Sequence, residues 1–217
     1  MLTVFIGFNK SILDFIFLNL SIIVFICLPL KKKYFLIIES IKDINLRNIK
    51  IHNKFIIIYR NQQTNDHIED LKKFRKQCRI RSIKFYVANN ITLCVLLKSD
   101  GIYLSSFNKS FKSLNLKRAN FGIIGSAHNS SEITFKIKQG CNYILLSKLF
   151  TVDYDKKSKI LGIIMFNYYL KNMFSKLIPL GGIKVSNLNK LKTINCEAIS
   201  LLSEIKKKPT QIIGRLF

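Results

Sequence analysis

Short runs of consecutive apolar residues alternate with amphipathic segments along this chain from residue 34 onward. A strand that is buried on both faces of a parallel sheet reads as a continuous apolar run. Eight segments have this character, and we expect them to be strands: 34–38, 55–59, 85–87, 102–104, 121–124, 143–146, 178–180 and 198–202.

The segments between these runs predict helices outside the sheet. Residues 66–78 place their apolar side chains on one face, as an amphipathic helix does. Helices are expected over 66–78, 91–97, 130–140, 162–174 and 185–191. This alternation predicts a single (β/α)8 TIM barrel, an α/β fold. A doubly wound sheet is the alternative, but it would need a Gly-rich turn after the first strand, where the chain has Glu39-Ser-Ile-Lys42.

The first 30 residues form an apolar extension that differs from the rest. Residues 12–30 are almost entirely apolar and are followed by Lys31-Lys-Lys33. A helix of this length, at about 1.5 Å per residue, is just long enough to span a bilayer, with the lysines and the barrel on the cytoplasmic side. The segment is either such an anchor or an unselected extension of the reading frame. We therefore divide the chain into residues 1–30, a barrel over 31–205 and a basic tail over 206–217.

The charge and cysteine content of the chain indicate which kinds of molecule it binds and in which compartment it works. The formal net charge is +24, but the lysines are spread along the whole chain and accompany no nucleic-acid-binding motif. We expect no nucleic-acid partner, and a basic surface that attracts small phosphorylated substrates. The five cysteines include no C-x-x-C pair, which argues against a disulfide framework or a zinc site and favours the reducing cytoplasm.

Candidate chemistry follows the ends of the predicted strands, where parallel barrels place their active sites. Gly181-Gly182 follows the seventh strand and precedes a helix, so its backbone N–H groups are available to a phosphate. His128 follows the fifth strand, and an imidazole titrates near neutral pH, as a general acid or base requires.

These segments together resemble the thiamine phosphate synthase/TenI family of β/α barrels. Gly125-Ser-Ala-His-Asn129 is similar to the family's G-x-S-x-H segment, and Leu180-Gly-Gly-Ile183 to its IGGI segment. The segments 99–104, 142–150 and 199–203 resemble further family motifs, in the same order. The resemblance implies the coupling of hydroxymethylpyrimidine diphosphate with thiazole phosphate, which gives thiamine phosphate and diphosphate.

The resemblance also implies roles for individual residues. Arg60 matches the Arg of the family's Q-x-R-x-K segment and would hold diphosphate together with Lys159, for which Lys156 or Lys157 is an alternative. Ser126 and His128 would face the substrates. The phosphate cradle would be formed by Gly181, Gly182 and Ser203.

Two departures concern the metal. The family's acidic Mg²⁺ ligands fall on Asn89 and Asn108, and an amide oxygen is a weaker ligand for Mg²⁺ than a carboxylate. A divergent synthase would still use Mg²⁺ there. The alternatives are a thiazole tautomerase of the same family, which needs no cofactor and uses His128 as its acid and base, or a non-catalytic barrel that binds a phosphorylated ligand.

Overall fold

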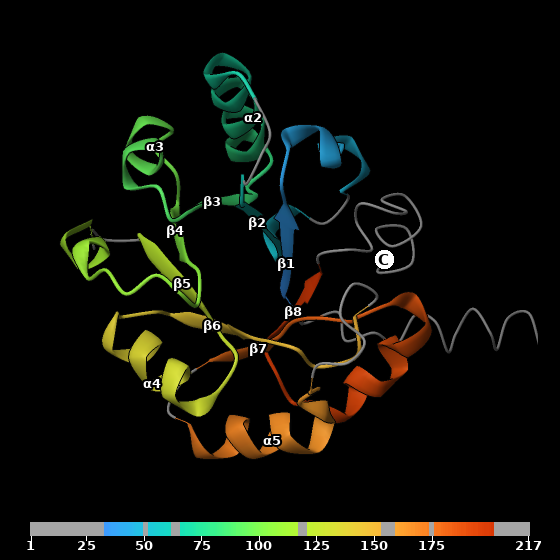
Figure 1. Ribbon diagram of the computed structural model, residues 1–217. Coiled ribbons are helices and arrows are strands. Elements are labelled where there is room, and N and C mark those ends of the chain that lie inside the picture. Colours follow the sequence, from blue (N-terminus) through green and yellow to red (C-terminus); the bar gives the residue numbers. More distant parts are fainter. Residues whose placement is uncertain are drawn as a thin grey trace, which may run out of the picture.

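The computed structural model describes residues 33–49, 52–61, 66–116, 121–152, 159–173 and 176–201. These residues form one barrel of parallel strands with helices around it (Figure 1). The expected extension over 1–30 and the tail over 206–217 lie outside the described residues. Among the described residues, no helix is long and apolar enough to cross a membrane.

Eight parallel strands make up the sheet, in the order β7-β6-β5-β4-β3-β2-β1-β8. Their bounds are β1 Lys33–Ile38, β2 Phe55–Tyr59, β3 Lys84–Ala88, β4 Gly101–Leu104, β5 Gly122–Ala127, β6 Tyr143–Leu146, β7 Leu177–Pro179 and β8 Ala198–Leu201. Strand β1 pairs with both β2 and β8, so the sheet curls back on itself. Within the described residues no ladder joins β7 to β8, which leaves a nearly closed barrel. The pairing confirms the predicted barrel and excludes the doubly wound sheet.

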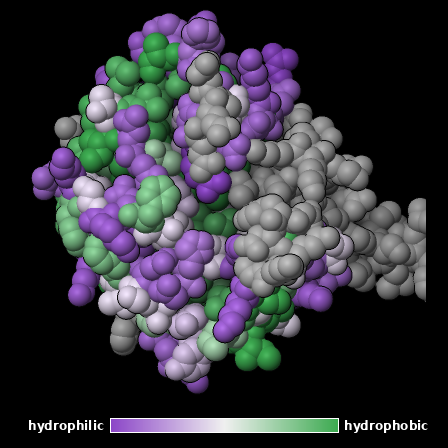
Figure 2. Space-filling model, viewed as in Figure 1, coloured by the Kyte–Doolittle hydropathy of each residue, from purple (hydrophilic) through white to green (hydrophobic). Residues whose placement is uncertain are grey.

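Helices follow most of the strands and lie on the outside of the barrel (Figure 1). The α-helices are α2 Ile68–Ile80, α3 Ile91–Leu96, α4 Ser130–Lys138 and α5 Gly162–Asn172. Short 3-10 helices fill the other connections: η1 Ile41–Asp43, η2 Leu46–Asn48, η3 His52–Lys54, η4 Lys112–Leu116 and η5 Val185–Thr193. The surface seen in Figure 2 is mostly hydrophilic, with hydrophobic residues between the polar ones.

The core has two layers because alternate strand residues face opposite sides of the sheet. On β1, Phe35 and Ile37 pack inside the barrel, whereas Leu36 and Ile38 belong to the larger cluster between the strands and the helices. Both sets are completely buried. This double burial explains why the strands read as continuous apolar runs in the sequence.

Tyr86 fills the barrel interior near the amino ends of the strands. Gly101 and Gly122 are the first residues of β4 and β5, and a Cβ atom on either glycine would collide with the Tyr86 side chain. The phenol therefore occupies this end of the barrel interior.

The expected elements differ from the observed ones mainly at their ends. Strand β5 continues to Ala127, three residues beyond the predicted end at residue 124. The helix expected from residue 66 begins at Ile68, because the Asp66 carboxylate accepts hydrogen bonds from Ser40 Oγ, the Ile41 N–H and the Tyr59 hydroxyl. Asp66 thus ties the loops after β1 and β2 together instead of entering the helix. The segment expected to be a helix over 185–191 is the 3-10 helix η5.

Candidate functional site

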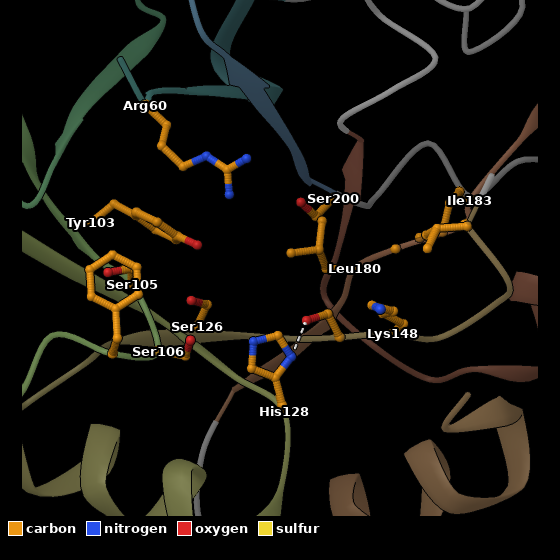
Figure 3. A pocket seen from close by; sticks show the side chains of 15 residues that line it. Arg60, Tyr103, Ser105, Ser106, Ser126, His128, Lys148, Leu180, Ile183 and Ser200 are labelled. Atoms are coloured by element: carbon orange, nitrogen blue, oxygen red, sulfur yellow. Dashed lines mark hydrogen bonds between the residues drawn. The ribbon is translucent and has the colours of Figure 1, made fainter. Parts of the chain in front are cut away.

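A cavity of about 300 Å³ opens at the carboxyl ends of the strands (Figure 3). Every strand from β4 to β8 contributes to it, either directly or through the residues that follow, and Arg60 enters from the end of β2. The lining residues are Arg60, Tyr103, Ser105, Ser106, Phe107, Ser126, His128, Ser147, Lys148, Val152, Leu180, Gly181, Gly182, Ile183 and Ser200. None of these lining residues is acidic, and Arg60 and Lys148 are cationic side chains, so the cavity suits an anion.

Arg60 is fixed at its backbone and extends its guanidinium into the centre of the cavity (Figure 3). Its N–H donates to the Ile38 carbonyl over 2.8 Å, which continues the β1–β2 ladder by one residue. Among the described residues, the carboxylate oxygen that pairs with Arg60 is Glu39 Oε1, 3.9 Å from Nη2 and at the outer limit of an ion pair. The buried Nε has no hydrogen-bond partner among the described residues. A buried donor without a partner is costly, and an anionic ligand in the cavity would satisfy it.

Gly181 and Gly182 form a tight turn one residue after the end of β7. Both have positive φ angles, +94° and +67°, which residues other than glycine rarely adopt. The Gly181 carbonyl accepts from the Phe150 N–H over 3.0 Å, and the Gly182 carbonyl accepts from Asn187 Nδ2 over 2.8 Å. The turn is therefore held by the loop after β6 and by η5, and its backbone forms one wall of the cavity.

Three hydroxyl side chains in the barrel interior make the floor of the cavity polar. The Tyr103 hydroxyl lies near Ser126 and Arg60, and both of these side chains favour its charged form. Burial raises the pKa of the Tyr103 hydroxyl above its usual value, so it stays protonated and able to donate. The buried Ser200 Oγ has no hydrogen-bond partner among the described residues. A polar ligand in the cavity could form a hydrogen bond with this oxygen, as it could with the Arg60 Nε–H.

His128 is held in a defined position at the mouth of the cavity. Asn129 caps α4 by accepting from the Glu132 N–H, so the chain turns into the helix directly after His128. The His128 N–H donates to Glu132 Oε2 over 2.9 Å, and its Nδ1 lies 3.0 Å from Ser147 Oγ. Figure 3 shows the imidazole beside the serine hydroxyls of the cavity. An oriented imidazole at a ligand site can transfer protons.

The structure does not bring Asn89 and Asn108 into this cavity. They line a separate groove between α3 and the loop before η4. Asn89 Oδ1 accepts from the Ser105 N–H over 3.0 Å and from Asn108 Nδ2 over 3.0 Å, and Asn108 Oδ1 accepts from the Ser110 N–H over 2.9 Å. Both amide oxygens already serve protein donors, and among the described residues no group of three His, Cys, Asp or Glu side chains gathers. This donor set does not fit Mg²⁺.

Some of the predicted site residues line the cavity, and others do not or lie outside the described residues. The structure brings Arg60, Ser126, His128, Gly181 and Gly182 together in the cavity. Lys159 is exposed and is not among the lining residues. Ser203, Lys156 and Lys157 lie outside the described residues.

Sequence reasoning missed Lys148, Ser147 and Ser200. Ser147 and Lys148 come directly after β6, so the rule that barrels carry chemistry at the ends of strands points to them. Ser200 is a buried polar residue within β8, two positions after Ala198 on the face that packs inside the barrel. A serine inside an otherwise apolar strand is the signal that was available in the sequence.

Comparison with known proteins gives related sequences. A family model described as thiamine monophosphate synthase matches residues 40–205. The chain is similar to the thiamine-phosphate synthase of Prochlorococcus marinus (strain AS9601), with 26% identity over 171 residues, which are 78% of this chain and 48% of that protein. The thiamine-phosphate synthase of Bacillus cereus (strain B4264) is 23% identical over 142 residues, 64% of this chain and 65% of that protein. The chain thus spans about half the length of the Prochlorococcus relative.

Solved structures have the same fold. Thiamine phosphate pyrophosphorylase from Pyrococcus furiosus superposes with a TM-score of 0.64 and 17% identity, over 86% of this chain and 95% of that one. The 3-hexulose-6-phosphate synthase of Salmonella typhimurium gives a TM-score of 0.62 at 10% identity, over 85% of this chain and 96% of that one. At such identities the likeness concerns the barrel alone.

Proposed function

This chain belongs to the thiamine monophosphate synthase family, and we propose that it acts in thiamine biosynthesis by forming thiamine phosphate from hydroxymethylpyrimidine diphosphate and thiazole phosphate. The observation that carries the proposal is the pairing of the Arg60 guanidinium, whose buried Nε has no partner, with the Gly181–Gly182 turn in one cavity without acidic residues. Such a cavity suits two phosphorylated molecules held side by side.

The proposed reaction breaks one C–O bond and forms one C–N bond. The electron pair of the pyrimidine methylene C–O bond leaves with diphosphate, and the lone pair of the thiazole nitrogen then attacks the methylene carbon. Arg60 and Lys148 would stabilise the charge that develops on the departing diphosphate. The Gly181–Gly182 turn would hold the thiazole phosphate, and the Tyr103 and Ser200 hydroxyls would orient the ring system between them.

The position of His128 supports a second candidate, a thiazole tautomerase. Its Nδ1 lies 3.0 Å from Ser147 Oγ at the mouth of the cavity, a geometry suited to moving a proton. This reaction releases no diphosphate and needs no divalent metal, in keeping with the amide oxygens of Asn89 and Asn108 that are already hydrogen-bonded.

The test of the proposed function uses the full chain with both substrates, with and without Mg²⁺, and detects thiamine phosphate by mass spectrometry. Formation of thiamine phosphate with release of one diphosphate per product supports the synthase. The proposal is wrong if thiazole phosphate binds and no thiamine phosphate forms under either condition, and the tautomerase then becomes the leading candidate.

A His128→Asn variant separates the two reactions. We expect it to lower thiamine phosphate formation by less than tenfold, because Arg60 and the Gly181–Gly182 turn remain in place. Tautomerase activity on the thiazole carboxylate phosphate would fall by about 10²–10⁴-fold, the usual contribution of a general acid or base. Steady-state rates of both reactions, with Lys138→Met on the exposed face of α4 as the control, decide between the candidates. A hundredfold loss of thiamine phosphate formation would contradict the assigned roles.

A further inference from the structure

Lys136, on α4, is a lysine with no exposed surface. Its Nζ donates to the backbone carbonyl oxygens of Ser105 over 2.7 Å and Asn108 over 2.9 Å, and to Gln139 Oε1 over 2.9 Å. All three N–H bonds of the ammonium are thus used, without a carboxylate partner among them. A buried charge is costly, so a lysine placed here calls for an explanation beyond packing.

The barrel makes room for this side chain at Gly125 of β5. A Cβ atom on Gly125 would lie 2.9 Å from Lys136 Cδ and 2.8 Å from Cys141 Sγ, closer than real Cβ contacts. The aliphatic part of Lys136 therefore passes over the bare backbone of the strand that carries Ser126. Burial lowers the pKa of Lys136 to about 8, which still leaves the amine mostly protonated at neutral pH.

The backbone acceptors of the ammonium lie in the loop of residues 105–110, which follows β4. Ser105, Ser106 and Phe107 of this loop line the cavity. Gln139 Nε2 adds a bond to the Asn108 carbonyl over 3.1 Å and one to the Ser110 carbonyl over 2.7 Å. Lys136 of α4 and Gln139, which follows α4, thus bind this loop through its backbone carbonyl oxygens.

The same loop is also joined to Asn89 through amide groups. Asn89 Nδ2 donates to Ser105 Oγ over 2.9 Å, and Asn108 Nδ2 donates to Asn89 Oδ1. Two carboxylates at positions 89 and 108 would repel each other without a cation between them, whereas two amides pair directly. The charge that such a cation would bring is supplied here from inside the protein.

We propose that Lys136 is a positioning residue whose buried ammonium organises the loop of residues 105–110, and with it one wall of the cavity, so that the wall forms without a divalent metal at Asn89 and Asn108. The residue touches no substrate, and its effect passes through the backbone of Ser105 and Asn108. Lys136 has this role already in the ligand-free protein, whichever molecule the cavity binds.

Hydrogen–deuterium exchange of the ligand-free full chain tests this inference. The reporters are the amides of Ser105, Asn108 and Ser110, which donate to Asn89 Oδ1, the Ser105 carbonyl and Asn108 Oδ1, respectively. In Lys136→Met we expect their exchange to accelerate at least tenfold, while amides of β1 and β2 keep wild-type rates. Lys136→Arg, which keeps the charge, should restore most of the protection. Lys138→Met, on the exposed face of the same helix, should change nothing.

Magnesium separates a positioning role from simple packing. Wild-type exchange at the three reporters should be equal in millimolar Mg²⁺ and in EDTA. In the triple variant N89D/N108D/K136M, Mg²⁺ should restore protection that EDTA removes. Wild-type rates in Lys136→Met, or wild-type protection that EDTA abolishes, would overturn the proposal. If Lys136→Met fails to fold, the wild-type comparison in Mg²⁺ and EDTA decides alone.

Discussion

Replacing Arg60 with alanine is expected to lower the rate of thiamine phosphate formation by about 10²–10³-fold, the usual cost of removing one preorganised donor to developing charge. The guanidinium enters the centre of the cavity, and its buried Nε has no partner among the described residues, so a bound diphosphate would be its main ligand. Because the neighbouring Glu39 oxygen is 3.9 Å away, little stability is lost with the side chain. Thermal unfolding should therefore change little.

Two matched variants sharpen this result. Arg60→Lys keeps the charge but loses the planar fork, so we expect activity between wild type and Arg60→Ala. Arg79→Ala removes an equal charge from an exposed position of α2 and should leave the rate unchanged. Steady-state rates at saturating substrates make the comparison. Equal rates in Arg60→Ala and Arg79→Ala would show that Arg60 does not contribute to the reaction.

Replacing Gly182 with alanine is expected to reduce the free energy of unfolding by about 2–4 kcal/mol, through a strained backbone and a steric clash. The glycine has a φ of +67°, and a Cβ atom there would lie 2.5 Å from the carbonyl oxygens of both Phe150 and Thr151. Backbone atoms cannot rotate away as a side chain can. The midpoint of thermal unfolding should fall by roughly 5–15 °C, and binding of thiazole phosphate should be lost with the shape of the turn.

Gly162 provides the control for this variant. It has a similar φ of +71°, but a Cβ atom there would meet nothing within 4 Å. Gly162→Ala should therefore cost only the strain of the left-handed backbone, about 1–2 kcal/mol. Equal shifts in the midpoint of thermal unfolding for the two variants would show that the close approach of Gly182 to the loop after β6 does not add to the loss of stability.

The barrel could be predicted from sequence because its strands are buried on both faces. Segments such as 55–59 and 143–146 are short, continuous apolar runs, which is typical of a strand buried on both faces, and the structure has β2 and β6 at these residues. The end of β5 could not be read in this way, because Gly125, Ser126 and Ala127 resemble a loop in composition. They are strand residues because β6 pairs alongside them, a contact distant in sequence.

The site could be predicted where a residue follows a strand directly or matches a family motif, as Arg60, His128 and the two glycines do. Lys148 and Lys159 show the limit of this reasoning. Lys148 is the second residue after β6 and lines the cavity, whereas Lys159, which the family motif indicated, lies much further along the chain and does not. Lys136 was unpredictable for another reason: a helix of mixed charge gives no sign that one of its lysines points inward.

Isothermal titration of the full chain with thiazole phosphate and with the matching thiazole alcohol would show whether the cavity recognises phosphate esters. The phosphate should bind at least about 100-fold more tightly than the alcohol, since charge-assisted hydrogen bonds from Arg60 and hydrogen bonds from the Gly181–Gly182 turn would be made to the phosphate alone. Equal affinities for the two compounds, or binding of neither, would contradict it.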